Sequence, residues 1–348
     1  VNAPNGGGSG PWFQCEVSVS VSSTEMNVNS NGIPNHNWVS AFGPGDVQSH
    51  TWSIPLNPTN DTTGGHTSTN CPAANGQWEC AAARGQVAVA SNGVPIFGPE
   101  EGPGGDAVAL DFFYFTEDRQ PIDLGYCGAH AGPTGVHYHW DAMCQYWEPE
   151  TGETMQDYDW SLIDSTKHSP IIGWSFDGYP IYGMYTWDDA GEVKGMKSSY
   201  EVERTSESGD QGYNGIDDWN YVSGSGDLDQ CNGRYGPTPE YPEGTYAYYC
   251  TVDEAYNSAY PYAVGPKFYG VYTNSMVVNV NETTIVYTDA DNVRDNPLSV
   301  VKINVYPNPA AELVAIQVNN SLQTNMTVSL LDVNGKLIDN TTIARGST

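Results

Sequence analysis

The stretch CEVSVSVSS, from Cys15 to Ser23, places a valine at every second position with a serine between each pair. Successive side chains of a β-strand point to opposite faces, so this spacing puts the valines together on one face. The sequence has no sustained 3.6-residue apolar period that would indicate long helices. The stretch therefore predicts a strand, and the fold class that we expect is mainly β, with at most one or two short helices.

Other short apolar runs extend this prediction along the chain. Four of them lie between Gly, Pro and Asn residues: GQVAVASNG (85–93), AVALDFFYF (107–115), PIIGWSF (170–176) and NSMVVNV (274–280). Three tight turns share one pattern of Asn-Gly or Asp-Gly, an apolar residue and a proline: NGIP (31–34), NGVP (92–95) and DGYP (177–180). We expect these turns to be related and to frame one site.

The charge balance narrows the class of partner. The 348 residues include 42 acidic and 12 basic residues, which gives a formal net charge of −30. Nucleic acid and anionic lipid are not expected as partners, because a polyanion would be repelled. The charge fits solubility in a salty medium, or capture of a cation such as calcium at the surface. No apolar run approaches the roughly 18 residues of a membrane helix, so we expect no transmembrane segment.

Changes in composition divide the chain into four parts. Residues 1–14 are expected to be a flexible lead-in, because they are rich in glycine. Residues 15–287 form a large β-rich domain, residues 288–299 an acidic linker, and residues 300–348 a small β-sandwich module. This module shows no closing strand and is expected to be truncated. The start at Val1 fits removal of a signal peptide, or a trimmed chain.

Seven cysteines indicate an exported protein braced by disulfides. The absence of a Cys-x-x-Cys pair argues against a zinc ribbon or a redox dithiol. Spacing along the chain suggests three local bridges and leaves Cys15 over, although sequence alone does not fix connectivity. The suggested pairs are Cys71–Cys80, Cys127–Cys144 and Cys231–Cys250.

Three of the seven histidines lie close together in GAHAGPTGVHYHWD, which runs from Gly128 to Asp141. His137 and His139 would share one face of a strand, and the turn-forming AGPTG would fold His130 back toward them. Three imidazoles suit zinc or copper, whereas calcium prefers oxygen ligands. The sequence therefore predicts a transition-metal site at these histidines, with a metal-free structural or acid/base role as the alternative.

Further candidates surround this prediction. His36, His168 and Asp177 lie beside the tight turns and are candidates to complete the metal site, or else ordinary structural residues. Closely spaced acids in DLDQCNG and DADNVRD are candidate calcium ligands, although neither segment matches an EF-hand loop: Asp227, Asp229, Asp289, Asp291 and Asp295. A serine-hydrolase elbow, a Walker loop and an H-E-x-x-H motif are all missing from the sequence.

The histidine segment CGAHAGPTGVHYHWD resembles the signature of the YHYH domain family, in which a Cys-Gly-Gly-His stretch precedes Tyr-His-Tyr-His. Ala129 replaces the second glycine and Val136 the first tyrosine, while all three histidines match. The flanking NGIPNH, NGVPIFGP, HSPIIGWSFDGYPIYG, LDQCNGR and YPYAVG match in order, so the resemblance covers Ser18 to Tyr272. It implies a secreted or surface protein whose histidines suggest a metal, and it implies no particular reaction.

The tail, from Ile303 to Thr348, resembles the C-terminal sorting domain of the type IX secretion system through YPNP and the later D-x-x-G-K. This resemblance implies a Bacteroidota protein that the type IX machinery carries to the outer-membrane surface or releases. DTT (61–63) and DST (164–166) resemble the short O-glycosylation motif of that phylum, with Thr62 and Ser165 as acceptors.

These observations lead to one expected function and two alternatives. The chain is expected to be a secreted or cell-surface protein that binds copper or zinc through His130, His137 and His139. The first alternative is a metal-dependent hydrolase or oxidoreductase that uses the same site with an open ligand position. The second is a structural or adhesive surface protein that binds calcium or glycans, with exposed aromatic side chains as stacking platforms.

Overall fold

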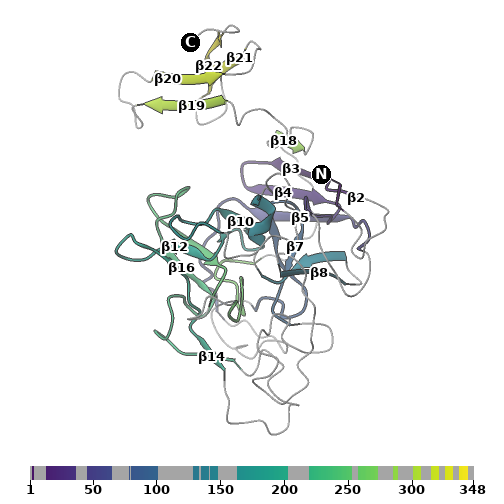
Figure 1. Cartoon of the computed structure of the whole chain (residues 1–348), viewed down its shortest axis with the longest axis vertical. Coiled ribbons are helices and arrows are strands. Elements are labelled where there is room, and N and C mark those ends of the chain that lie inside the picture. Colours follow the sequence, from purple (N-terminus) through teal and green to yellow (C-terminus); the bar gives the residue numbers. More distant parts are fainter. Residues whose placement is uncertain are drawn as a thin grey trace. The chain divides into compact units, whose positions relative to one another are not determined.

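The structure is a computed structural model, and it is mainly β with two compact units, Val1–Tyr287 and Thr288–Thr348, each described by itself (Figure 1). It describes residues 2–3, 13–36, 45–64, 78, 80–100, 128–132, 135–140, 142–147, 163–202, 219–252, 258–272, 285–288, 301–306, 315–320, 326–331 and 337–343. None of the helices in these ranges is long and apolar enough to cross a membrane.

The centre of the first unit is an eight-stranded mixed sheet in the order β16-β17-β11-β10-β6-β7-β9-β8. Its strands are β6 (Gln86–Ala90), β7 (Pro95–Phe97), β8 (Ala129–Gly132), β9 (Gly135–Tyr138), β10 (Ile171–Ser175), β11 (Pro180–Tyr182), β16 (Gly233–Gly236) and β17 (Thr245–Tyr249). Most neighbours are antiparallel, and the pairs β7–β9 and β11–β17 are parallel. The hairpin of β8 and β9 therefore lies at one edge of the sheet.

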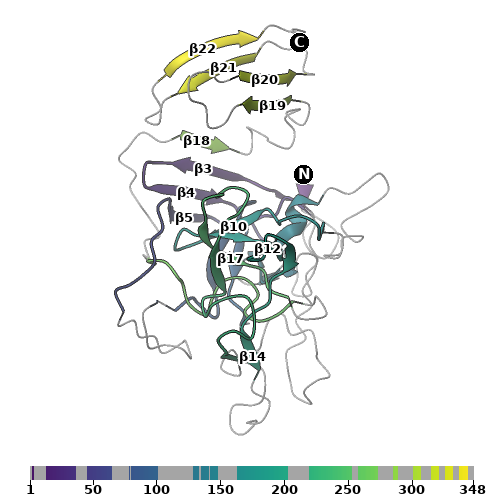
Figure 2. The same ribbon diagram turned by 90° about the vertical axis from the view of Figure 1, so that its left-hand side faces the viewer.

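A second sheet of four strands packs on the first (Figure 2). Its order is β18-β3-β4-β5, with β18 (Ile285–Thr288), β3 (Val17–Val21), β4 (Glu25–Ser30) and β5 (His50–Pro55). Val28, Trp52 and Ile54 form a buried cluster with Val89 of the large sheet, and Val17 and Val19 pack against that cluster. The predicted strand with its valines on one face is therefore confirmed for Val17 and Val19, which face the interface between the two sheets.

Short hairpins complete the first unit, and two hairpins make up the described part of the second. The first unit adds β1 (Asn2–Ala3), β2 (Phe13–Gln14), β12 (Tyr185–Trp187), β13 (Val193–Gly195), β14 (Tyr200–Val202), β15 (Trp219–Tyr221) and the 3-10 helix η2 (Ala142–Tyr146). The second unit pairs β19 (Val301–Tyr306) with β20 (Ala315–Asn320), and β21 (Met326–Leu331) with β22 (Leu337–Ile343). A mainly β fold is confirmed in both units.

The predicted strands have different outcomes. Those in CEVSVSVSS, GQVAVASNG and PIIGWSF are confirmed as β3, β6 and β10. AVALDFFYF and NSMVVNV lie outside the described residues, so the structure says nothing of them.

The three tight turns share one conformation but do not frame one site. Gly32, Gly93 and Gly178 all have positive φ angles, of 69°, 78° and 95°. The first two turns lie together, because Asn92 Nδ2 donates to Asn35 Oδ1 at 2.9 Å. The third lies at the opposite end of the sheet, since β10 runs antiparallel to β6 and each turn follows the end of its own strand. The prediction of a single shared site is therefore wrong for the third turn.

Among the described cysteines, two lie in disulfides and three do not. Cys80 and Cys144 each lie in a disulfide. Their predicted partners, Cys71 and Cys127, lie outside the described residues, so the pairs Cys71–Cys80 and Cys127–Cys144 stay predictions. The predicted bridge Cys231–Cys250 is wrong, because neither residue is in a disulfide. The left-handed φ of 68° at Asn232 turns the chain off the β16–β17 ladder just before Gly233.

Cys231 comes just before Asn232 and lies outside the strand. Its backbone N–H donates to the Asp229 carboxylate at 2.8 Å. Cys15 is likewise outside any disulfide, and its Sγ lies 3.5 Å from the Asn92 carbonyl oxygen.

A buried carboxylate ties the segment 258–272 to the large sheet. Asp177 is completely buried, and its Oδ2 accepts from Tyr248 Oη at 2.6 Å and from the Gly270 N–H at 2.7 Å. Burial raises the pKa of this carboxyl group, and the hydrogen bonds oppose that rise only in part. Folding therefore favours the protonated form of Asp177 relative to the unfolded chain.

Stability should consequently depend on pH through Asp177. An acid whose pKa is higher in the folded state stabilises the fold below its unfolded pKa of 3.8 and loses that contribution as pH rises through the folded value. Asp177→Asn keeps an acceptor oxygen without the charge, so its free energy of unfolding should fall less between mildly acidic and neutral pH, by about 1.4 kcal/mol per unit of pKa shift removed. Denaturant unfolding of both proteins across this range measures the difference, and equal slopes would contradict the prediction.

Candidate metal centre

The register of one hairpin brings the three predicted histidines to the same face. His130 of β8 pairs directly with His137 of β9. The ladder ends at the pair Ala129–Tyr138, and just beyond it the His139 N–H donates to the Gly128 carbonyl at 2.8 Å, in the same register. Directly opposed residues and residues two apart on a strand share a face. All three imidazoles therefore point to one side of the hairpin.

Glycines at two positions allow this hairpin to form. Gly128 has a φ of 60°, and a Cβ there would lie 2.7 Å from the Trp140 carbonyl oxygen. Gly135 has a φ of 90°, and a Cβ there would lie 2.6 Å from Gln48 Cγ. An L side chain would be strained at both positions, so the glycines that flank the histidines are part of the site's construction.

The three imidazoles lie close enough to bind one ion. One nitrogen from each ring lies within 4.8 Å of the others, and His130 Nε2 is 3.3 Å from His139 Nε2. The ring centroids are 4.4 to 5.2 Å apart. All three side chains are buried, with exposed fractions of 2%, 3% and 1% along the chain. Within the described residues, no other group of three or more His, Cys, Asp or Glu side chains converges in this way.

Backbone carbonyls fix which nitrogen of two rings carries the proton. His137 Nδ1 lies 3.1 Å from the Gly135 oxygen, and His139 Nδ1 lies 2.8 Å from the Gly98 oxygen. A carbonyl oxygen only accepts, so each Nδ1 must donate its hydrogen. In the neutral rings, Nε2 then carries the lone pair, which is the form that binds metals.

These residues fit a transition-metal ion, and the separation of one pair of nitrogens agrees with a tetrahedral site. Zinc–nitrogen bonds of about 2.0–2.1 Å place two ligands of a tetrahedral site about 3.3–3.4 Å apart. The 3.3 Å between His130 Nε2 and His139 Nε2 agrees with that spacing. An all-imidazole set also suits zinc or copper and does not suit calcium.

Phe97 and Gly98 are site residues that the sequence analysis did not assign. Phe97, at the end of β7, stacks on the His137 ring with centroids 3.9 Å apart. Gly98 follows it and supplies the carbonyl that orients His139. A Cβ at Gly98 would lie 2.0 Å from the Ala82 carbonyl oxygen, so only glycine fits. Both residues lie within the motif NGVPIFGP (92–99), but the sequence analysis assigned them no role.

His36 lies on the opposite side of β9 from the three clustered histidines. Its Nε2 is 2.6 Å from Tyr138 Oη and 3.4 Å from Cys144 Sγ. Tyr138 points away from His137 and His139 because side chains alternate along a strand. The structure therefore brings His36 next to the site without placing it among the converging nitrogens.

His168 and Asp177 are also outside the cluster. His168 Nδ1 contacts the Ser169 carbonyl at 2.7 Å, and its Nε2 contacts Thr186 Oγ1 at 2.6 Å. Burial lowers the pKa of His168, which favours its neutral form. Asp177 uses its carboxylate on Tyr248 and Gly270, as described above. Both residues have structural contacts instead of a place among the converging nitrogens.

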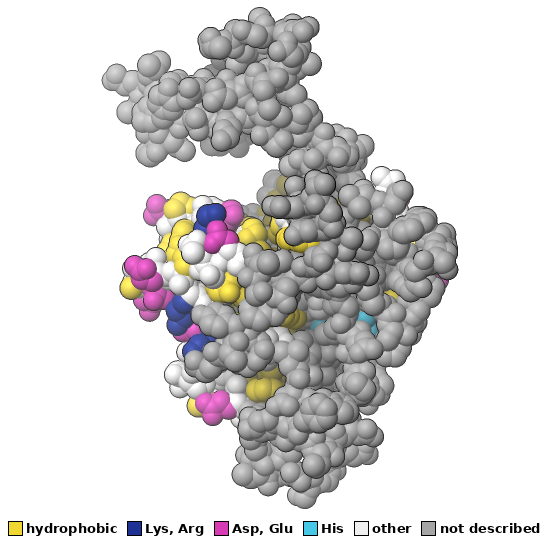
Figure 3. Space-filling model, in the orientation of Figure 1, with side chains coloured by type: hydrophobic (Ala, Val, Ile, Leu, Met, Phe, Trp, Pro, Cys, Tyr) yellow, Lys and Arg dark blue, Asp and Glu magenta, His cyan; other side chains and the backbone are white. Residues whose placement is uncertain are grey.

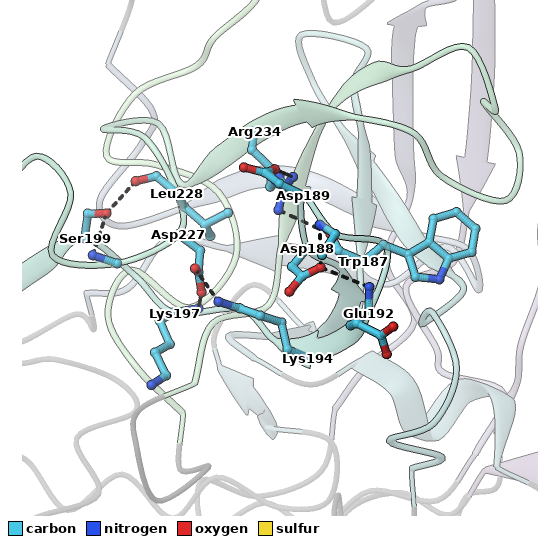
Figure 4. Close-up of polar contacts among 12 residues, drawn as sticks. Trp187, Asp188, Asp189, Glu192, Lys194, Lys197, Ser199, Asp227, Leu228 and Arg234 are labelled. Atoms are coloured by element: carbon cyan, nitrogen blue, oxygen red, sulfur yellow. Dashed lines mark hydrogen bonds and ion pairs between the residues drawn. The ribbon is translucent and has the colours of Figure 1, made fainter.

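The two described candidate calcium ligands point to different partners. Asp227 forms an ion pair with Lys194 at 2.6 Å and accepts from the Lys197 N–H (Figure 4). Asp229 accepts from the N–H groups of Cys231 and Gly233 and from Tyr246. The structure thus gives each carboxylate donors from the protein itself. Asp289, Asp291 and Asp295 lie outside the described residues.

The surface near this ion pair carries charges of both signs. Arg234 pairs with Asp189 at 2.6 Å beside the hairpin of β12 and β13. Figure 3 shows lysine and arginine side chains next to acidic ones on the described part of this face. Some of the acidic side chains are therefore paired locally with basic ones.

The two candidate glycosylation segments have the same local geometry. Asp61 Oδ1 accepts from the N–H and the hydroxyl of Thr63, and Asp164 Oδ1 accepts from the same groups of Thr166. Thr62 and Ser165, the residues between, are both exposed. Glycosylation of these residues stays a prediction.

Comparison with known proteins identifies both parts of the chain. Residues 304–348 match the secretion system C-terminal sorting domain, which shows export through the type IX secretion system to the cell surface or beyond. No curated protein and no solved structure matches the chain. The YHYH protein family matches residues 51–260, more than half of the sequence and all three clustered histidines. The chain therefore belongs to the YHYH protein family.

Proposed function

We propose that this exported protein binds a transition-metal ion, zinc or copper, through His130, His137 and His139. The observation that carries the proposal is the convergence of one nitrogen from each buried ring within 4.8 Å. The carbonyls of Gly135 and Gly98 support it, because they orient two rings with their lone pairs on Nε2. A bound ion would supply positive charge that links the two strands of the hairpin.

The spacing of the nitrogens favours a tetrahedral ion. A square-planar copper(II) site with bonds of about 2.0 Å would bring neighbouring nitrogens to about 2.8 Å. The separation of 3.3 Å between His130 Nε2 and His139 Nε2 is wider and suits zinc(II) or copper(I). The protein would then hold such an ion outside the cell, after handling by the type IX machinery through its sorting domain.

Two other functions keep specific observations in their favour. Three imidazoles leave one position of a tetrahedral ion for water or substrate, so the same site could serve a metal-dependent enzyme. Tyr235 and Tyr241 are 67% and 42% exposed around β16 and would offer stacking surfaces to a glycan. The burial of all three histidines favours metal binding over both alternatives.

Replacing two ligands should abolish metal binding. His137→Gln with His139→Gln preserves much of the side-chain volume and removes two imidazole nitrogens. Affinity for zinc should fall by more than the roughly 100-fold that loss of an outer partner causes. Plasma mass spectrometry of the purified proteins and competition titration with a chromophoric chelator measure the loss.

The matched control for this experiment is His168→Gln. It replaces a half-buried histidine whose contacts are with Ser169 and Thr186. This variant should keep the metal content of the original protein. Full occupancy in the double variant would refute the proposed ligands, and absence of zinc and copper binding in the original protein would refute the proposed function.

Gly98→Ala should lower zinc affinity, although Gly98 is not itself one of the proposed metal ligands. The new Cβ would meet the Ala82 carbonyl at 2.0 Å, so the backbone must move and carry the Gly98 oxygen away from His139. Zinc affinity should fall by about 10- to 100-fold. Gly236→Ala is the control, because its Cβ meets only the flexible Arg234 side chain at 3.6 Å. Equal affinities in the two variants, measured by the same titration, would argue against the Gly98 carbonyl as an orienting group.

A further inference from the structure

We propose that Tyr138, His36 and Asn92 form a positioning network that holds His137 and His139 in place for the metal. This inference rests on the proposed function and deepens it, because it assigns roles to residues that do not touch the ion. The three residues come from distant parts of the chain and meet on the face of β9 that lies opposite the ligands.

The centre of the network is the Tyr138 hydroxyl group. Tyr138 is completely buried, and its oxygen lies 2.6 Å from His36 Nε2 and 2.8 Å from Asn92 Nδ2. Asn92 donates one hydrogen bond to this oxygen, which leaves the tyrosine O–H for the lone pair of His36. A buried hydroxyl with two such partners has a strongly preferred position.

Asn92 is itself fixed by the second tight turn. Its Oδ1 accepts from the Val94 N–H at 3.3 Å, and its Nδ2 also reaches Asn35 Oδ1 at 2.9 Å. Gly93 has a φ of 78°, and a Cβ there would lie 2.4 Å from Val17 Cγ2, so the turn tolerates only glycine. The first two tight turns therefore converge on Tyr138 and present rigid partners to it.

Anchoring Tyr138 fixes the residues on either side of it. His137 and His139 flank Tyr138 in sequence and project from the other face of the strand. A rotation of β9 about its axis would move both imidazoles, and it would also break both hydrogen bonds of the tyrosine hydroxyl. The network thus resists the motion that would most easily spoil the spacing of the metal ligands.

The two hydrogen bonds of its hydroxyl explain why position 138 carries tyrosine. A phenylalanine would fill the same space without the two hydrogen bonds. The hydroxyl is what connects β9 to the turns at 31–36 and 92–95, which are otherwise far from it in sequence. His36, a predicted candidate ligand, is in this view a partner of the ligand-bearing strand.

The test compares two tyrosine-to-phenylalanine variants of the full chain. Tyr138→Phe removes the network hydroxyl. Tyr182→Phe is the matched control, because Tyr182 is equally buried and its hydroxyl contacts Thr238 and Glu240 instead of the network around Tyr138. Zinc affinity should fall by about 10- to 100-fold in Tyr138→Phe and stay unchanged in Tyr182→Phe. The visible spectrum of bound cobalt(II), which reports ligand geometry, should change only in Tyr138→Phe.

A second variant keeps the test decisive if Tyr138→Phe fails to fold. Asn92→Ala removes the side-chain amide that donates to the Tyr138 hydroxyl, and it should also lower zinc affinity. If both variants fold, their effects should be less than additive in the double variant, because they break one shared hydrogen-bond network.

The outcomes separate the two proposals. Normal zinc affinity and an unchanged cobalt spectrum in Tyr138→Phe and Asn92→Ala would overturn the positioning network and leave the proposed function intact. Absence of metal binding in the original protein would overturn both.

Discussion

The candidate site depends above all on the register of β8 against β9. His130 faces His137, and the ladder continues to His139, so three imidazoles share one face. A slip of one residue would send the side chains of one strand to the other face and separate the ligands. The glycines at positions 128 and 135, which allow conformations closed to other residues, and the anchored Tyr138 all act on this register.

Burial gives the cluster its chemical character. A transition metal binds the lone pair of a neutral imidazole nitrogen, and the buried setting brings three such nitrogens together away from water. Backbone carbonyls satisfy the Nδ1 atoms of His137 and His139 without adding a competing charge. The same low-dielectric surroundings make the position of each partner matter, because a polar group that loses its partner there is costly.

The acidic groups of the first unit are used differently from the histidines. Asp177 and Asp229 are held by hydrogen bonds from tyrosines and backbone N–H groups, and burial raises the pKa of both. Asp227 is balanced by Lys194 at the surface. Asp177 and Asp229 therefore join segments of the fold to one another, and, among the described residues, the histidine hairpin is where three groups that could hold a metal ion converge.

The sequence by itself determined the fold class, the strand that carries His137 and ends next to His139, and both family resemblances. These features depend on residues close together in the chain, where the alternation of side chains is fixed by strand geometry. The export route also follows from a local motif in the tail.

Only the tertiary structure decided which distant residues meet. In the structure, Phe97 and Gly98 contact the clustered histidines, and His36 lies on the far side of β9. The third tight turn lies apart from the first two. It also left Cys231 and Cys250 outside any disulfide, although their spacing suggested a bridge between them. Such contacts depend on how the sheets pack and on single backbone angles, which residue spacing along the chain does not encode.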